Sequence, residues 1–314
     1  MCIVNKIVNL IKKINIDTVI RENEPLSAHN CFQTGGCADV FVEPSSRQEL
    51  LEILKLLKRE GVPRFILGGG ANILVSDKGV RGVVIDMKRL NRISLEKNIL
   101  RVEAGCSISE ASLKAARWGF KGLQFIYGMP GSLGGALWMN ARCYSGEISH
   151  IFSWADIINE DLKVERIVFK QDDWDYKKSP FQNRDCVILS GAFRMEKAPS
   201  PQLLIFMDKI KKDREEKGHY RAPCAGSTFK NNRDFGSPSG VLIENAGLRG
   251  KCLGAAAVSD WHGNILINKG NATSREISDL IRLVQDKVKE KTGFMLEAEV
   301  LKIGDWELED GKSD

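Results

Sequence analysis

Histidine is scarce in this 314-residue chain, and its cysteines follow no metal-binding or redox pattern. The four His are scattered, and none of the eight Cys forms a C-x-x-C pair. A chain of this length can bury a core without disulfides. We therefore expect reduced thiols, no metal site and a cytoplasmic location.

Long hydrophobic runs and a strong charge imbalance are also absent. No stretch approaches the roughly 18 consecutive apolar residues of a membrane span, so we expect no membrane insertion. Lys and Arg number 46 against 41 Asp and Glu, a net charge of +5. This mild charge fits an anionic small molecule better than a nucleic acid.

The first 22 residues need a separate interpretation. Residues 2–20 are apolar, but lysines interrupt the run and no small-residue cleavage site follows it. This pattern favours an amphipathic helix docked on the fold over a signal peptide. The apolar residues on one helical face are Ile3, Ile7, Leu10, Ile11 and Ile14.

Periodicity along the rest of the chain indicates mixed helix and strand. Helical spacing predicts main helices over residues 47–60, 109–118, 203–217 and 274–292, with a short one near 241–246. Short apolar runs predict strands that include residues 38–42, 65–67, 83–86, 100–104 and 295–303. The Pro- and Ser-rich stretch 197–202 is typical of a domain boundary.

Two glycine-rich loops are candidate anion sites. The first, Gly68-Gly69-Gly70-Ala71-Asn72-Ile73, leaves a predicted strand. The second runs from 128 to 141 and includes Pro130, Gly131, Ser132, Gly134, Gly135, Ala136 and Asn140. Bare backbone can approach a phosphate closely. Neither loop has the Walker A or dinucleotide-fold pattern, so a pyrophosphate-bearing cofactor and two tight turns both remain open.

Several further motifs occur in one order along the chain. They are Thr34-Gly35-Gly36 within 30–38, Tyr176-Lys177-Lys178-Ser179-Pro180-Phe181, Ala225-Gly226-Ser227-Thr228-Phe229-Lys230-Asn231, Gly247-Leu248-Arg249-Gly250 and Leu296-Glu297-Ala298-Glu299-Val300. With the glycine loops, they resemble the UDP-N-acetylenolpyruvoylglucosamine reductase family from about residue 30 to 304. The spacing from 247 to 254 resembles its compact subtype, which lacks a long substrate loop.

The resemblance implies an α+β fold, with a two-part p-cresol methylhydroxylase-type FAD-binding domain and a smaller α+β substrate-binding domain. It implies FAD, NADPH as hydride donor, and reduction of UDP-N-acetylglucosamine enolpyruvate to UDP-N-acetylmuramate. Neither glycine loop contains His or Cys, so we expect non-covalent FAD. The expected divisions are an N-terminal helix (1–22), two FAD-binding subdomains (23–88 and 89–197), the substrate-binding domain (198–304) and a polar tail (305–314).

The resemblance also assigns roles to individual residues. It implies that FAD contacts Gly68, Gly69, Gly70, Ala71, Asn72, Ile73, Pro130, Gly131, Ser132, Gly134, Ala136 and Asn140. It implies substrate contacts from Tyr176, Arg214, Lys217 and Asn231. Arg214 and Lys217 would lie near the substrate's diphosphate, although lysines around them also suit a solvated helix face.

Three residues match the family's catalytic positions: Lys177, Ser227 and Glu299. Hydride addition to the enolpyruvyl β-carbon builds negative charge, which a fixed cation stabilises. A positioned acid then delivers a proton to the α-carbon, the role implied for Ser227. Glu297 and Glu299 are expected on one face of a strand, with Glu299 as the catalytic carboxylate.

Lys177 departs from the family, which has arginine there. Lysine keeps the charge but loses the bidentate fork. Lys178 in a shifted register, or Arg142 or Arg249, are the alternative cations. Arg142, Cys143, Ala255 and Ala298 also depart from the family's usual residues.

Two other functions remain open at this stage. One is a flavin oxidase or dehydrogenase of the same fold with another substrate. The other is a catalytically inactive relative that binds a nucleotide sugar or a cell-wall partner.

Overall fold

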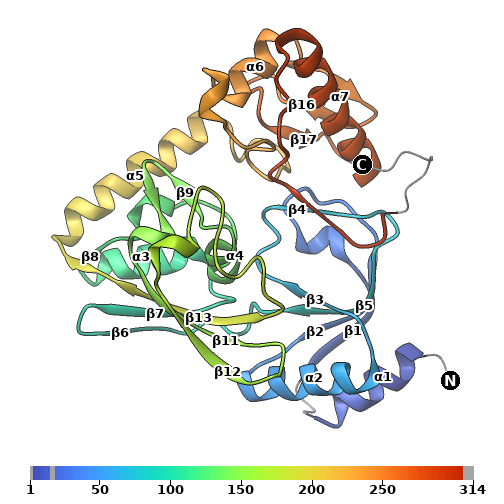
Figure 1. The fold of residues 1–314 in the computed structure, drawn as a ribbon, viewed down its shortest axis with the longest axis vertical. Coiled ribbons are helices and arrows are strands. Elements are labelled where there is room, and N and C mark those ends of the chain that lie inside the picture. Colours follow the sequence, from blue (N-terminus) through green and yellow to red (C-terminus); the bar gives the residue numbers. More distant parts are fainter. Residues whose placement is uncertain (1–2, 15–17, 307–314) are drawn as a thin grey trace. The chain divides into compact units, whose positions relative to one another are not determined.

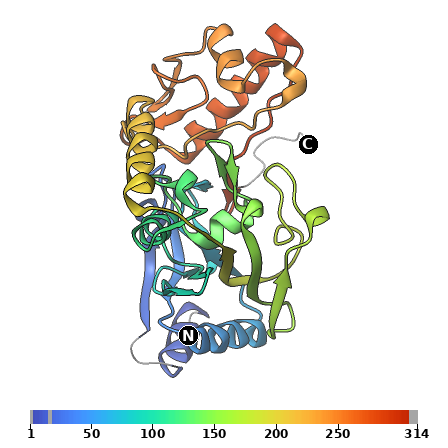
Figure 2. The same cartoon turned by 90° about the vertical axis from the view of Figure 1, so that its left-hand side faces the viewer.

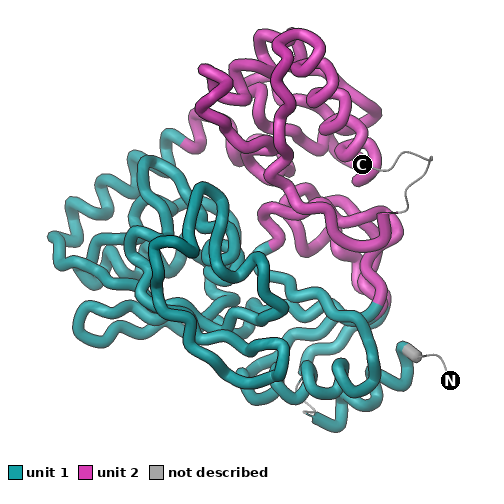
Figure 3. The backbone as a smooth tube through the Cα atoms, viewed as in Figure 1, with its two compact units in different colours: residues 1–22, 40–69, 82–213 teal, residues 23–39, 70–81, 214–314 magenta. Residues whose placement is uncertain are grey.

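The computed structural model describes residues 3–14 and 18–306 and divides into two compact units. The first unit comprises residues 1–22, 40–69 and 82–213, and the second comprises 23–39, 70–81 and 214–314 (Figure 3). Residues 1–2 and 15–17 of the predicted N-terminal helix segment, and 307–314 of the predicted tail, lie outside the described residues. The division into five segments stays a prediction.

The first unit contains two helices that begin and end where the sequence signals them. Helix α2 (Arg47–Glu60) starts at Ser46, whose side chain accepts the Glu49 N–H, and ends at Gly61 in the left-handed conformation. Its Leu50, Ile53 and Leu57 are fully buried. Helix α1 (Ile3–Lys12) packs beside α2 and buries Ile7, Val8 and Ile11 (Figure 1). A docked helix is therefore present, but it ends at Lys12, and residues 19–22 of the predicted segment lie in a strand because they pair within a sheet.

Two sheets shape this part of the chain. The four-stranded sheet has the order β1-β2-β5-β3, with β1 (Val19–Pro25), β2 (Cys37–Glu43), β5 (Val80–Asp86) and β3 (Arg64–Leu67). The five-stranded antiparallel sheet has the order β12-β11-β13-β7-β6, with β12 (Val164–Val168), β11 (Phe152–Ile158), β13 (Val187–Arg194), β7 (Ile99–Glu103) and β6 (Ile93–Glu96). Strand β13 is buried along Val187–Phe193 because it is the central strand.

Helices cover the five-stranded sheet and position the glycine loops. Helix α4 (Leu133–Trp138) packs on β13 (Figure 2), and Gly191 makes room for Leu137. Helix α3 (Ile108–Arg117) packs through Ala116 against Leu203 and Met207 of α5 (Ser200–Glu216). Val102 of β7, which leads into α3, and Leu133 at the start of α4 belong to one buried core.

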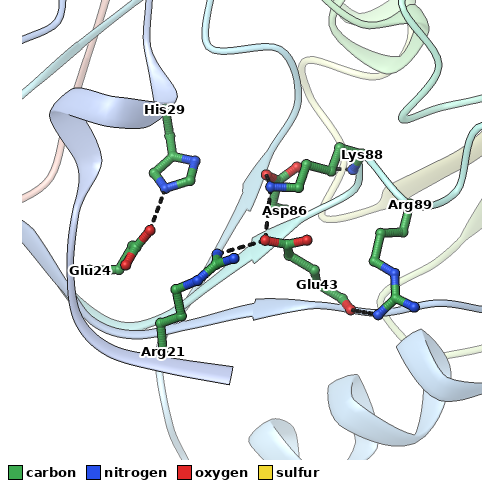
Figure 4. A network of polar contacts seen from close by, with 7 residues as sticks. All are labelled: Arg21, Glu24, His29, Glu43, Asp86, Lys88 and Arg89. Atoms are coloured by element: carbon green, nitrogen blue, oxygen red, sulfur yellow. Dashed lines mark hydrogen bonds and ion pairs between the residues drawn. The ribbon is translucent and has the colours of Figure 1, made fainter. Parts of the chain in front are cut away.

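A buried ion network braces the first sheet (Figure 4). Glu43, 4% exposed, pairs with Arg21 at 2.7 Å and with Lys88 at 2.8 Å. Burial alone would raise the pKa of Glu43, but hydrogen bonds from Lys88 and Arg21 outweigh it, and the pKa is lowered. Burial raises the pKa of the neighbouring Asp86.

The second unit is a small sheet covered by helices. Strands β15 (Cys252–Leu253), β16 (Ala256–Val258) and β17 (Leu266–Asn268) are antiparallel, and α7 (Ser274–Thr292) packs on them. A capping box between Thr273 and Glu276 begins α7, and Gly293 ends it. Helix α6 (Ser239–Asn245) contacts α7, and β4 (Ile73–Val75) pairs in parallel with β18 (Leu301–Ile303).

The predicted helices at 47–60 and 274–292 have the expected bounds, but the predicted strand 295–303 is only partly right. Residues 301–303 form β18, whereas Ala298 makes an isolated bridge to Phe229. The segment changes partners between these points, which interrupts the ladder.

The described residues contain no helix long and apolar enough to cross a membrane. No disulfide joins the cysteines within residues 3–14 and 18–306. That part of the chain also brings together no group of three or more metal-ligating side chains.

Candidate active site

Two predicted glycine loops meet in the first unit. A Cβ added to Gly68 would overlap Ser132 Oγ, and one added to Gly69 would lie 2.5 Å from Gly131 Cα. Gly131 itself has a φ of +121°. Only glycine allows this approach, so the close contact between the loops explains these three glycines without a ligand and also leaves bare backbone beside them.

The start of α4 uses most of its N–H groups within the protein. Ser132 Oγ accepts the Gly135 N–H at 3.3 Å, and the Gly134 N–H donates to Ala104 O at 2.8 Å. The Ala136 N–H donates to Ser132 O at 2.9 Å. Gly134 and Ala136 can therefore offer a cofactor a close-packed surface rather than hydrogen-bond donors.

The end of the first glycine loop belongs to the second unit. A Cβ at Gly70 would overlap His29 O, and the residue has a φ of +61°. Asn72 Nδ2 donates to Glu299 O at 3.0 Å, and Asn72 O accepts the Leu301 N–H at 3.1 Å. Asn72 Oδ1 is buried and has no hydrogen-bond partner among the described residues. An acceptor buried in this way suits a ligand that brings a donor.

Ser227 and Glu299 lie on adjoining segments of the second unit. The Glu299 N–H donates to Thr228 O at 2.8 Å, and Ser227 bridges Ile265 on its other side. Ser227 is exposed, and Glu299 is half-buried. Glu297 is 70% exposed and pairs with Lys230 at 2.5 Å. Glu297 is thus committed to an ion pair.

A buried asparagine that sequence reasoning missed holds the Ser227 segment. Asn264 is 2% exposed; its Oδ1 accepts the Phe229 N–H, and its Nδ2 donates to Phe229 O, both at 2.8 Å. Asn264 O also accepts the Thr228 N–H at 2.9 Å. The side-chain amide therefore pairs with the Phe229 backbone as a residue of a neighbouring strand would.

His262 supports this arrangement as a neutral ring. Its Nδ1 accepts the Asn264 N–H at 3.0 Å, which places any ring proton of the neutral form on Nε2. Burial lowers the pKa of His262 and outweighs the opposing effect of the Glu244 carboxylate, so the neutral ring is favoured.

Lys177 occupies a strained position in a tight turn of the first unit. Asp175 and Lys178 exchange backbone hydrogen bonds of 3.3 and 3.0 Å, and Lys177, third in the turn, has a φ of +59°. Glycine is usual at such a position, and strain of this kind concentrates at functional sites. Lys177 is half-buried, whereas the Lys178 side chain is 69% exposed and lies 3.9 Å from Asp175.

Asn140, predicted to contact the cofactor, connects that turn to the loop that follows α4. Its Nδ2 donates to Asp175 O at 3.0 Å, and its Oδ1 accepts the Ser149 N–H at 3.1 Å. The side chain is 1% exposed. Asn140 therefore braces the turn, and direct cofactor contact by it stays a prediction.

The predicted substrate residues differ in burial. Arg214 is 8% exposed, and its Nε donates to Tyr220 Oη at 3.2 Å, so it is not part of a solvated helix face. Lys217 and Asn231 are exposed. Asn231 Oδ1 accepts the Ser239 N–H at 2.9 Å and so fixes the start of α6. The fourth predicted residue, Tyr176, lies in the turn of the first unit.

Sequence comparison gives the class of the protein. The family described as "FAD binding domain" matches residues 38–167, and the one described as "UDP-N-acetylenolpyruvoylglucosamine reductase, C-terminal domain" matches residues 218–303. The buried Asn72 Oδ1 and the bare backbone of the paired glycine loops fit an FAD group. The chain is an FAD-binding α+β oxidoreductase, as predicted.

Relatives of similar length make the assignment specific. The UDP-N-acetylenolpyruvoylglucosamine reductase of Treponema denticola is 41% identical over 90% of this chain and 93% of its own. The enzyme of Borrelia garinii is 41% identical over 96% and 98%. The crystal structure of the Thermus caldophilus enzyme matches with a TM-score of 0.76 and 26% identity, over 91% of this chain and 98% of its own. The chain belongs to the UDP-N-acetylenolpyruvoylglucosamine reductase family.

Proposed function

We propose that this chain uses FAD and NADPH to reduce the enolpyruvyl double bond of UDP-N-acetylglucosamine enolpyruvate, yielding UDP-N-acetylmuramate for peptidoglycan. The full-length match to reductases of that name supports the substrate. The observation that carries the chemistry is the backbone bond between Glu299 and Thr228, which sets a carboxylate segment beside Ser227. We place the reaction in the cytoplasm.

When bound, FAD would supply the hydride chemistry of this reaction, in which a hydride from NADPH reaches the β-carbon of the double bond. Lys177 stabilises the negative charge that develops on the α-carbon and its carboxylate. Ser227 Oγ donates a proton to the α-carbon, and solvent restores that proton. Glu299 supplies a carboxylate that orients the serine hydroxyl or the substrate.

The remaining residues bind the two ends of the reactants. Gly68, Gly69 and Gly131 provide backbone surface for the cofactor's pyrophosphate. Asn72 Oδ1, an acceptor, takes a hydrogen bond from an N–H or O–H group of the cofactor. Arg214 and Lys217 bind the substrate's diphosphate, with Tyr176 and Asn231 as further contacts. Arg214 is buried and, among the residues that the structure describes, hydrogen-bonds only the neutral Tyr220, so it keeps most of its donors for such an anion.

The deciding experiment measures NADPH oxidation by the purified yellow protein. We expect oxidation to require UDP-N-acetylglucosamine enolpyruvate and to yield UDP-N-acetylmuramate. A yellow protein that oxidises NADPH without this substrate would be another flavin oxidase. A colourless protein that binds the nucleotide sugar would be an inactive relative.

Replacing Ser227 with alanine separates the two half-reactions. We expect Ser227→Ala to keep flavin reduction by NADPH, because the hydroxyl acts only after the flavin is reduced. Reoxidation by the substrate should become very slow, as followed by flavin absorbance in a single turnover. Normal reoxidation would remove Ser227 from the mechanism.

A further inference from the structure

The Asp175–Lys178 turn, which carries Lys177, is tied to a rigid hairpin in the same unit. Strands β9 (Arg142–Cys143) and β10 (Gly146–Glu147) pair antiparallel, and Tyr144 and Ser145 between them have φ values of 45° and 65°. Two consecutive left-handed residues define a tight type I′ hairpin.

Three contacts fix the orientation of this hairpin. Tyr144 Oη donates to Asp213 Oδ2 at 2.6 Å, and Cys143 Sγ donates to Phe125 O at 2.8 Å. Two residues before the hairpin, Asn140 Nδ2 donates to Asp175 O at 3.0 Å and so connects the chain that enters the hairpin to the turn. The first residue of the hairpin, Arg142, is therefore held at a set place beside the turn.

Arg142 lies against the residue that precedes Lys177. Its Cζ is 5.8 Å from the centre of the Tyr176 ring, a cation–π contact that limits the motion of the guanidinium. Its one charged partner in the described part of the chain is Glu147, 3.7 Å from Nη1 and beyond hydrogen-bond length. Glu147 also accepts a 2.5 Å hydrogen bond from Ser149 Oγ. The guanidinium therefore keeps donors for an anion.

We propose that Arg142 is a second cation of the active site, and that it binds the carboxylate of the enolpyruvyl group together with Lys177. The inference rests on the proposed function. A carboxylate with charge spread over two oxygens is best bound by a planar fork of N–H donors. Lysine is a point charge and cannot provide that fork. Arg142, which packs on the ring of Tyr176, the residue before Lys177, provides it.

The test follows the two half-reactions of the holoenzyme by anaerobic stopped-flow absorbance. For Arg142→Met we expect unchanged FAD content and unchanged flavin reduction by NADPH. The concentration of UDP-N-acetylglucosamine enolpyruvate that gives half-maximal reoxidation should rise roughly 10- to 100-fold, the effect of losing charged hydrogen bonds. Arg142→Lys should show a smaller rise, because it keeps the charge and loses the fork.

A double variant tests whether Arg142 and Lys177 bind the substrate carboxylate together. We expect Lys177→Arg to restore flavin reoxidation by the substrate in the Arg142→Met background. The new guanidinium at position 177 then provides the planar set of donors that Arg142 and Lys177 provide together in the wild type. Arg166→Met is the control. The Arg166 Cζ lies 5.1 Å from the centre of the Trp154 ring, its side chain is 52% exposed, and its Nε pairs with Asp156 at 2.8 Å. Within the described residues no contact joins Arg166 to the Asp175–Lys178 turn, so both half-reactions of Arg166→Met should be unchanged.

Each contrary result has a distinct meaning. Loss of FAD from Arg142→Met would indicate that the guanidinium binds the cofactor's pyrophosphate. If only the flavin reduction by NADPH becomes slow, the guanidinium binds NADPH. Either result overturns the proposal. Unchanged reoxidation also overturns it. If UDP-N-acetylglucosamine enolpyruvate does not reoxidise the flavin of the wild-type enzyme, the proposed function itself is overturned. If Arg142→Met fails to fold, Arg142→Gln carries the same comparison.

Discussion

Lys177 has an unusual backbone for a lysine. Its left-handed conformation costs of order 1 kcal/mol or more, so the fold holds the residue there against its preference. Its neighbour Lys178 is exposed and pairs with Asp175 within the same turn. The two adjacent lysines, alike in sequence, are therefore unlike in environment.

This difference predicts unequal effects of removing the two charges. We expect Lys177→Met to lower turnover by roughly 10²–10³, the usual effect of losing a charged stabiliser of the transition state. Lys178→Met should change turnover little, and Lys177→Arg should retain activity. Steady-state NADPH oxidation measures all three. A damaging Lys178→Met beside a harmless Lys177→Met would show that the catalytic cation is Lys178.

Motifs singled out Ser227 and Glu299 as candidates, and their catalytic roles stay predictions. Sequence reasoning did not single out Asn264, which holds the Ser227 segment through the backbone of Phe229, 35 residues earlier in the chain. A lone buried asparagine has no periodicity or spacing that distinguishes it from a surface one, and its role becomes visible only when its partners are placed.

The elements of the fold also differ in how well the sequence predicts them. Helix α2 was predictable because its apolar spacing, Ser46 cap and Gly61 stop are all local. The apolar run at 295–303 predicts one strand, but Ala298 bridges Phe229 whereas residues 301–303 pair with β4. Pairing between distant segments leaves no local signal.

The segment that carries Ser227 should depend on Asn264 for its stability. Asn264→Ala leaves the buried N–H and C=O of Phe229 without their partner, so we expect a loss of about 2 kcal/mol or more in the free energy of unfolding. Urea denaturation measures it. Asn264→Asp should be no better, because it turns an oxygen toward Phe229 O. The exposed Asn232→Ala is the control and should cost far less.

The ion network on the first sheet should show in the pH dependence of stability. The pKa of Glu43 is lowered in the folded protein, so its contribution is complete above the unfolded pKa and is lost as pH falls through the folded one. Glu43→Gln should therefore destabilise the protein near neutral pH by about 1–3 kcal/mol. This deficit should shrink in acid. Thermal unfolding of the wild type and of Glu43→Gln across pH 3–7 measures this deficit. A stability difference that stayed constant with pH would contradict the assignment.

At the scale of the whole molecule, FAD should be a removable part of the native state. Acid precipitation should release the yellow colour, because neither glycine loop offers His or Cys for covalent attachment. Adding FAD to the stripped protein at 100 times its Kd should stabilise it by about 2.7 kcal/mol, seen as a rise in Tm. Colour that stays with the precipitate would point to Cys143 or His150 as an attachment site.

The interleaving of the two units constrains how the protein can be synthesised. Phe32 and Leu74 are fully buried in the core that residues 214–314 form, yet they are made long before it. On the ribosome, residues 23–39 and 70–81 must wait for almost the whole chain before that core can close. During this interval their apolar side chains have no native partners, which exposes the nascent chain to chaperones and to misfolding. A gene cut at residue 214 would yield a fragment that lacks part of its own core.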